Sequence, residues 1–177
     1  MVNQVICTDI ALARPALVRL CQQSGEMVNL LVPSATTMVV VESLKGEVFL
    51  KATPLKGRDL PMHGTASGKC FLAFSSDAVQ RSTLSALTFT KTTQKTIGDA
   101  KRLEKEFAKI RKAGYATEED EYTADTVALA VPIIDQGGRI RATLSLHGPG
   151  ARFGAARRPK LLVLLQKEAQ RIGRELL

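Results

Sequence analysis

The segment from Leu60 to Ala73, with the sequence LPMHGTASGKCFLA, contains the residues best suited to bind a small anion. Its pattern predicts an extended arm followed by a helix with Thr65 as the N-cap. The first four N–H groups of a helix have no partner within it, and the helix dipole adds about half a positive charge there. A carboxylate or phosphate could therefore bind at the amides of Ala66, Ser67 and Gly68. The alternative is a helix start that only packs against the core.

The glycines of this segment do not form a nucleotide-binding P-loop. That motif needs four residues between its glycines and a Ser or Thr after its lysine. Here three residues separate Gly64 from Gly68, and Cys70 follows Lys69. Lys69 therefore lacks the neighbouring hydroxyl that would help to hold a magnesium ion.

Histidine and cysteine side chains offer few candidates for catalysis or metal binding. His63 and His147 are the only histidines, and neither lies in a metal-ligand spacing such as HExxH. Cys70 lies near a helix start, where a thiolate can be stabilised, but a small buried cysteine is the simpler interpretation. A thiol-dependent enzyme that uses Cys70, or a zinc site of His63, Cys70 and His147, stays open as an alternative. The leading expectation is a protein without enzymatic activity, cofactor or metal.

Two polar patterns in the second half of the chain could line a cavity. Glu118 begins a run of four acidic residues that is typical of a solvated turn. One or two of these carboxylates could turn inward, where they would need a hydrogen-bond donor or would take up a proton. Ser145 and His147 are two residues apart in a predicted strand and so share one face. That face meets either water or a cavity.

Length and composition favour one reduced, cytoplasmic domain. A chain of 177 residues can bury its own core, which must be aliphatic because aromatic residues make up 5% and Trp is absent. No apolar run approaches the roughly 20 residues that span a bilayer, and no secretory signal is visible at the N-terminus. The three cysteines are too few and too scattered for a disulfide framework.

The net charge of +8 raises the question of nucleic-acid binding. The basic residues cluster on two predicted helices, between Lys101 and Lys112 and between Arg157 and Arg174, where they alternate with apolar positions. This arrangement is typical of solvated helix faces. No recognition-helix pair, zinc knuckle or interleaved aromatic residues accompany it. Direct DNA readout by this chain is therefore not expected.

The remaining elements must position these candidate residues. Helices are expected over about residues 10–23, 65–74, 99–114 and from 159 onward, with another short helix after Ser76 or Asp77. Pro15 places the true start of the first helix close to itself. Strands are expected over about residues 27–32, 37–41, 47–51, 126–134 and 140–147. Hairpins outnumber crossover units, which predicts an α+β domain with a mainly antiparallel sheet.

Four motifs resemble one known family and occur in that family's order. They are LPMHGTASGKCFLAF, LEKEFAKIRKAGYATEEDE, VALAVPIID and LSLHGPGARF. From about Ala16 to the end, the chain resembles the C-terminal effector-binding domain of the IclR family of bacterial transcription regulators. The resemblance implies a GAF-like fold with a curved, mainly antiparallel sheet and flanking helices. It implies a linker or helix start over residues 1–15, an effector-binding domain over residues 16–177, and no winged helix-turn-helix domain.

The resemblance also implies a set of ligand-binding residues. Its anion-holding amides, acidic position, strand positions and apolar walls correspond to Ala66, Ser67, Glu118, Ala128, Ser145, His147, Phe49, Ala52 and Leu60. Ala128 lacks the thiol that is common there in the family, and His147 stands where a small serine is common. His147 would either add a second contact to an anion or narrow the pocket.

The function implied by the resemblance is the sensing of a small organic or aromatic acid. Members of the family form dimers or tetramers through this domain, and they contact DNA through the N-terminal domain that this chain lacks. No membrane partner is implied. The remaining alternative to a sensor or a thiol enzyme is a purely structural oligomerisation module.

Overall fold

One six-stranded antiparallel sheet organises the molecule in a computed structural model that describes residues 2–46 and 55–175, with side chains from residue 10 onward. The strand order is β3-β2-β1-β6-β5-β4. The strands are β1 Met27–Ser34, β2 Thr37–Leu44, β3 Asp59–Pro61, β4 Ala116–Glu119, β5 Thr126–Ile134 and β6 Ile140–Pro149. The helices are α1 Val2–Ser24, α2 Ala66–Phe74, α3 Asp77–Ala86, α4 Ala100–Ala113 and α5 Arg158–Glu175, with a 3-10 turn, η2 Gly150–Arg152.

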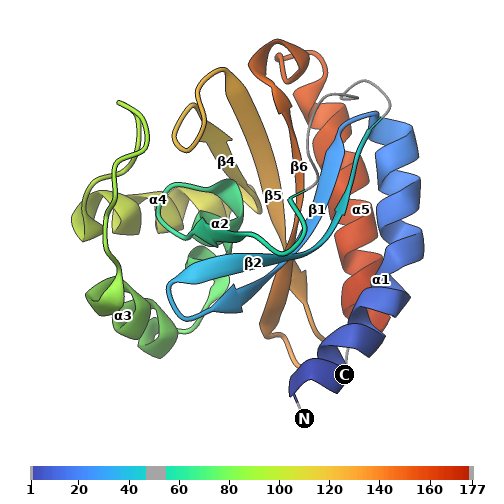
Figure 1. Cartoon of the computed structure of the whole chain (residues 1–177), viewed down its shortest axis with the longest axis horizontal. Coiled ribbons are helices and arrows are strands. Elements are labelled where there is room, and N and C mark those ends of the chain that lie inside the picture. The colour runs from blue at the N-terminus through green and yellow to red at the C-terminus, as the bar shows by residue number, and fades with distance from the viewer. Residues whose placement is uncertain (1, 47–54, 176–177) are drawn as a thin grey trace.

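Helices cover both faces of the sheet (Figure 1). Helices α1 and α5 lie side by side on one face, and α2 and α4 pack on the other. Strand β5 shows the consequence, because Leu129 and Val131 point into the α1–α5 layer while Ala128 and Ala130 point toward α2. Successive side chains of a strand point to opposite faces, so a strand covered on both sides is buried throughout.

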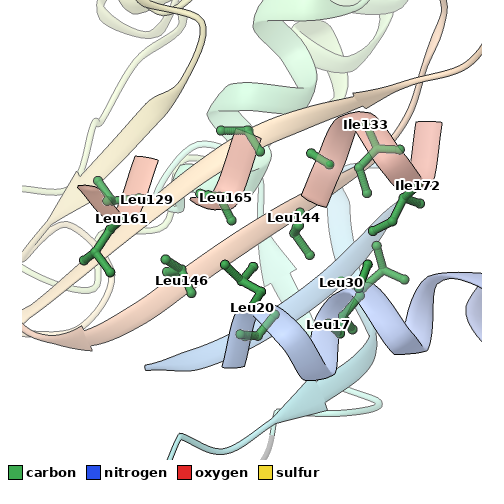
Figure 2. Packing of buried hydrophobic residues seen from close by; sticks show 14 of the residues in the cluster. Leu17, Leu20, Leu30, Leu129, Ile133, Leu144, Leu146, Leu161, Leu165 and Ile172 are labelled. Carbon is green, nitrogen blue, oxygen red and sulfur yellow. The ribbon is translucent and has the colours of Figure 1, made fainter. Parts of the chain in front are cut away.

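The layer of α1 and α5 forms a continuous aliphatic core. Figure 2 shows leucine and isoleucine side chains from both helices meeting those of β1, β5 and β6. Leu17 and Leu20 of α1 and Leu165 of α5 are fully buried. Leu17 and Leu20 are three residues apart, and the buried Leu161, Leu165 and Ala169 of α5 are four apart, so each set lies on one stripe of its helix. This layer supports the sheet from behind and leaves the opposite face to carry a site.

Small residues bring α2 close to the arm that precedes it. A Cβ atom on Gly68 would lie 2.2 Å from the Met62 Cα atom and 2.4 Å from the Met62 carbonyl oxygen. Only glycine allows this approach, because such distances are far inside van der Waals contact. The first turn of α2 therefore lies directly against the backbone of Met62.

The α+β class and the antiparallel sheet predicted from the sequence are confirmed, whereas several element bounds differ. Helix α1 continues through Pro15 to Val2, so the predicted start near Pro15 was wrong. Proline in a helix removes one hydrogen bond. Burial of Ala13, Ala16, Leu17 and Leu20 against the sheet outweighs this cost.

Two further differences concern the sheet. The acidic run begins inside a strand, since Glu118 and Glu119 belong to β4, which pairs with β5. Strand β6 extends to Pro149, two residues beyond the predicted end of this strand. The strand predicted over 47–51 falls outside the described residues. Across residues 2–46 and 55–175, none of the helices has both the length and the apolar character needed to cross a bilayer.

Candidate ligand-binding site

A cavity of about 100 Å³ lies between the N-terminal end of α2 and the sheet. It is lined by Asn29, Leu31, Leu55, Arg58, Leu60, Thr65, Ala66, Ser67, Glu118, Tyr122, Thr123, Ala128, Ser145 and His147. All seven predicted site residues that the structure describes are in this lining, namely Leu60, Ala66, Ser67, Glu118, Ala128, Ser145 and His147. The other two, Phe49 and Ala52, lie outside the described residues.

The first turn of α2 presents two main-chain N–H groups to the cavity. Thr65 is the N-cap, as predicted, with extended backbone angles of φ −120° and ψ 149°. Its hydroxyl accepts a hydrogen bond from the Gly68 N–H at 3.2 Å and donates one to the Pro61 carbonyl at 2.8 Å. The prediction that Gly68 also offers a free amide was therefore wrong. The N–H groups of Ala66 and Ser67 have no partner within the described part of the chain.

The floor of the cavity consists of two rows of side chains across neighbouring strands. Glu118 pairs with Ala128, and Ala128 pairs with His147. In the next row, Ser145 of β6 lies opposite Asn29 of β1. Paired residues in a sheet project to the same face, and here that face is the one covered by α2. The polar face of β6 thus meets the cavity rather than bulk water.

Glu118 is the acidic residue of the run that turns inward. It is 3% exposed, and its Oε1 accepts hydrogen bonds from the N–H groups of Glu121 at 3.0 Å and Tyr122 at 3.1 Å. Burial raises the pKa of Glu118 from 4.5 to about 7, and the two hydrogen bonds oppose that rise in part. Near neutral pH, the carboxyl group is therefore available both as an acceptor and, when protonated, as a donor.

His147 brings an uncharged ring to the same floor. Burial lowers the pKa of His147, while the nearby Glu26 carboxylate acts in the opposite direction. Its Nδ1 atom is buried and has no hydrogen-bond partner among the residues described. Because a lowered pKa keeps the imidazole neutral at pH 7, His147 would contact an anion through a neutral N–H and not through charge.

Four polar residues of the cavity lining were not predicted as site residues from the sequence. Asn29 is a polar residue within the apolar run of β1, and Tyr122 and Thr123 follow the acidic run. Arg58 directly precedes β3 and stands two residues before the predicted wall residue Leu60. A polar side chain inside an apolar strand was a usable signal for Asn29. The position of Arg58 depends on how β3 pairs with β2, which local patterns do not reveal.

Cys70 and His63 have structural roles and are not in the cavity lining. Cys70 is fully buried, and burial raises the pKa of its thiol well above the ordinary value. The thiol form is therefore favoured over the reactive thiolate, contrary to the alternative of a thiol-dependent enzyme. His63 packs on Phe89, with ring centroids 5.2 Å apart, and its Nε2 lies 2.9 Å from the Thr90 carbonyl oxygen. No group of three or more His, Cys, Asp or Glu side chains that could hold a metal occurs in the described ranges.

Comparison with known proteins shows the family of the chain. A family model described as "Bacterial transcriptional regulator IclR C-terminal" matches residues 7–174. This chain belongs to the IclR C-terminal family. The family consists of transcription regulators, which relates this chain to transcription regulation rather than to a known enzyme. No winged helix-turn-helix domain is found among the elements in residues 2–46 and 55–175.

Individual members of the IclR family show how far the similarity extends. The acetate operon repressor of Salmonella typhimurium is 28% identical over 92% of this chain and 60% of its own length. The crystal structure of the Thermotoga maritima IclR protein is 28% identical, with a TM-score of 0.89 over 95% of this chain and 68% of that one.

The same fold occurs in an Acinetobacter PobR inducer-binding domain, a double mutant solved with 3-hydroxybenzoic acid. It is 22% identical, with a TM-score of 0.83 over 93% of this chain and 97% of that one. The chain spans about half to two thirds of the length of the curated IclR-family relatives it matches.

Proposed function

We propose that this domain senses a small organic acid for an IclR-type transcription regulator. The observation that carries the proposal is the pair of N–H groups of Ala66 and Ser67. These residues are only 1% and 4% exposed, they line the cavity, and their N–H groups have no protein partner among the described residues. Buried main-chain donors are rarely left unpaired, so a carboxylate is the natural acceptor at a helix N-terminus.

The cavity volume favours a short acid over a large one. An apolar cavity of about 150 Å³ holds a benzene molecule. The cavity here measures about 100 Å³, which suits an acid of a few carbon atoms better than a substituted aromatic ring. The PobR domain solved with 3-hydroxybenzoic acid shares the fold, so both classes of acid belong in a binding test.

Regulation would require that the affinity for the acid differs between the dimer or tetramer arrangements of the regulator. An acid can shift a dimer or tetramer only if it binds one arrangement more tightly than another. In this proposal, DNA contacts come from the N-terminal domain of an intact regulator in the cytoplasm, and neither a membrane nor a cofactor takes part. The effector-binding domain would then change the spacing of the DNA-binding domains.

Calorimetry with a panel of acids tests the proposal. The panel contains glyoxylate, pyruvate, lactate, succinate, benzoate and 3-hydroxybenzoate, and the variant is Ala66→Pro. Proline at this first helical position removes one docking N–H, and the extended backbone of Thr65 suits a following proline. We expect the best acid of the panel to bind Ala66→Pro about tenfold or more weakly.

Asp77→Pro is the matched control. It also replaces the first residue of a helix, α3, and the preceding Ser76 has a compatible extended backbone of φ −63° and ψ 155°. We expect Asp77→Pro to bind as the wild type does, because Asp77 is not in the cavity lining. Equal affinity of Ala66→Pro and wild type would disprove the helix-terminus site. A folded wild-type domain that binds no acid would favour a structural oligomerisation module instead.

A further inference from the structure

Arg58 is a cation in the cavity lining, and it has no ion-pair partner among the residues that the structure describes. Its side chain is exposed and, among the described lining residues, it is the only cationic one. No ion pair or side-chain hydrogen bond joins its guanidinium to any residue of 2–46 or 55–175. The neighbouring Lys56, in contrast, pairs with Glu42 at 3.3 Å.

The backbone of Arg58 is fixed even though its side chain is not. The Arg58 N–H donates to the Leu55 carbonyl at 3.0 Å, and the Arg58 carbonyl accepts from the Val40 N–H at 2.9 Å. These bonds tie the residue to β2 next to the start of β3. The Cα position is therefore determined by the sheet, and the long side chain can turn toward a ligand.

Two serine hydroxyl groups in the cavity lining have no hydrogen-bond partner among the described residues. Ser67 and Ser145 are each 4% exposed and both line the cavity. Neither hydroxyl has a hydrogen-bond partner in the described part of the molecule. Together with the amides of Ala66 and Ser67, they give the cavity lining a set of neutral donors in addition to the guanidinium of Arg58.

We propose that the ligand is a short dianionic acid, with one carboxylate at the amides of Ala66 and Ser67 and the other at Arg58. This inference rests on the proposed function and names its ligand class. A monocarboxylate at the amides would bring no second charge to the guanidinium of Arg58, which has no ion-pair partner among the described residues. The planar fork of an arginine binds a carboxylate through two parallel hydrogen bonds, which a second acid group would supply.

Calorimetry with acids matched in carbon number tests the inference. Propionate is compared with malonate, butyrate with succinate, and valerate with glutarate, on the wild type and on Arg58→Gln. We expect the wild type to prefer the diacid of at least one pair by about tenfold. Arg58→Gln should lose that preference and keep its affinity for the monoacid within about twofold, since the neutral donors remain. Arg58→Lys should keep part of the preference through its charge.

Arg81→Gln is the matched control. Arg81 is exposed on α3, is absent from the cavity lining, and its replacement changes the net charge by the same amount. We expect it to keep the wild-type preference for the diacid. The inference alone would be overturned if the preference for the diacid persisted in Arg58→Gln. It would also be overturned if monoacids bound as tightly as diacids and Ala66→Pro still weakened their binding. The absence of binding by every acid would overturn the proposed function as well.

Discussion

Lys69 and Glu121 form a nearly buried ion pair that joins α2 to the loop after β4. The Lys69 Nζ atom lies 2.6 and 2.7 Å from the two carboxylate oxygens of Glu121, and the lysine side chain is 3% exposed. The same loop supplies the Glu121 and Tyr122 N–H groups that hold Glu118, and it places Tyr122 and Thr123 in the cavity lining. This ion pair therefore helps to form one wall of the site.

Lys69→Met should destabilise the domain by about 2 to 4 kcal/mol, because it leaves the largely buried Glu121 carboxylate without its partner. Denaturant unfolding measures the loss. The control is Lys109→Met, which removes the exposed Lys109–Glu106 pair within α4. That change should cost less than about 1 kcal/mol. Similar losses of unfolding free energy for the two variants would mean that burial does not increase the contribution of the Lys69–Glu121 pair to stability.

Thr96 fixes the same loop from the other side. Its hydroxyl donates to the Glu121 carbonyl at 2.6 Å and accepts from the Thr93 N–H at 2.9 Å. The Thr96 hydroxyl also accepts from the Thr92 N–H at 3.1 Å. Thr96→Val keeps the shape but removes these bonds, and we expect a loss of about 1 to 3 kcal/mol in unfolding free energy. We also expect weaker acid binding, because the loop carries part of the cavity wall. Thr96→Ser keeps the hydroxyl and should retain most of the stability and affinity.

Helix boundaries set by side-chain caps were predictable from the sequence. Thr65, Ser76 and Asp99 each accept a hydrogen bond from an N–H group three residues later, as N-caps do. Gly114 ends α4 with a φ of 80°, a conformation that glycine adopts without strain. These features depend on residues within one turn of each other. Short-range chemistry therefore determines them, and no tertiary information is needed.

Elements that depend on long-range pairing were not predictable in the same way. Strand β4 is four residues long and half acidic, and it exists because it pairs with β5. The site residues also divide into those that local sequence determines and those that long-range pairing determines. Ala66 and Ser67 follow from the local start of α2, whereas Glu118 came from the family motif. Arg58 joins them only through the pairing of β3 with β2.

Glu118 should make both stability and acid binding depend on pH. Its pKa is raised in the folded protein, from 4.5 to about 7, so folding favours the protonated carboxyl. The associated stability is complete below about pH 4.5 and is lost as the pH rises through 7. A neutral Glu118 also repels an anionic ligand less, so acid affinity should fall between about pH 6 and 8. Both trends are measured as differences between the wild type and Glu118→Gln, whose uncharged amide should remove them. A pH dependence that persists in the variant would assign it to another group.

Gly68→Ala tests the close contact that positions the first turn of α2. The added Cβ atom would lie 2.2 Å from the Met62 Cα atom and 2.4 Å from the Met62 carbonyl oxygen, and backbone atoms cannot turn aside as a flexible side chain can. The helix must then shift away from the arm, at an expected cost of about 3 kcal/mol in unfolding free energy.

Gly98→Ala is the control for this substitution, because no atom lies within 4 Å of the Cβ position there. Its stability should stay within about 0.5 kcal/mol of the wild type, as for most surface substitutions. The shift of α2 in Gly68→Ala also moves the amides of Ala66 and Ser67, so acid affinity should fall in Gly68→Ala and stay unchanged in Gly98→Ala. If Gly68→Ala kept wild-type stability and affinity, the first turn of α2 would not need its contact with Met62.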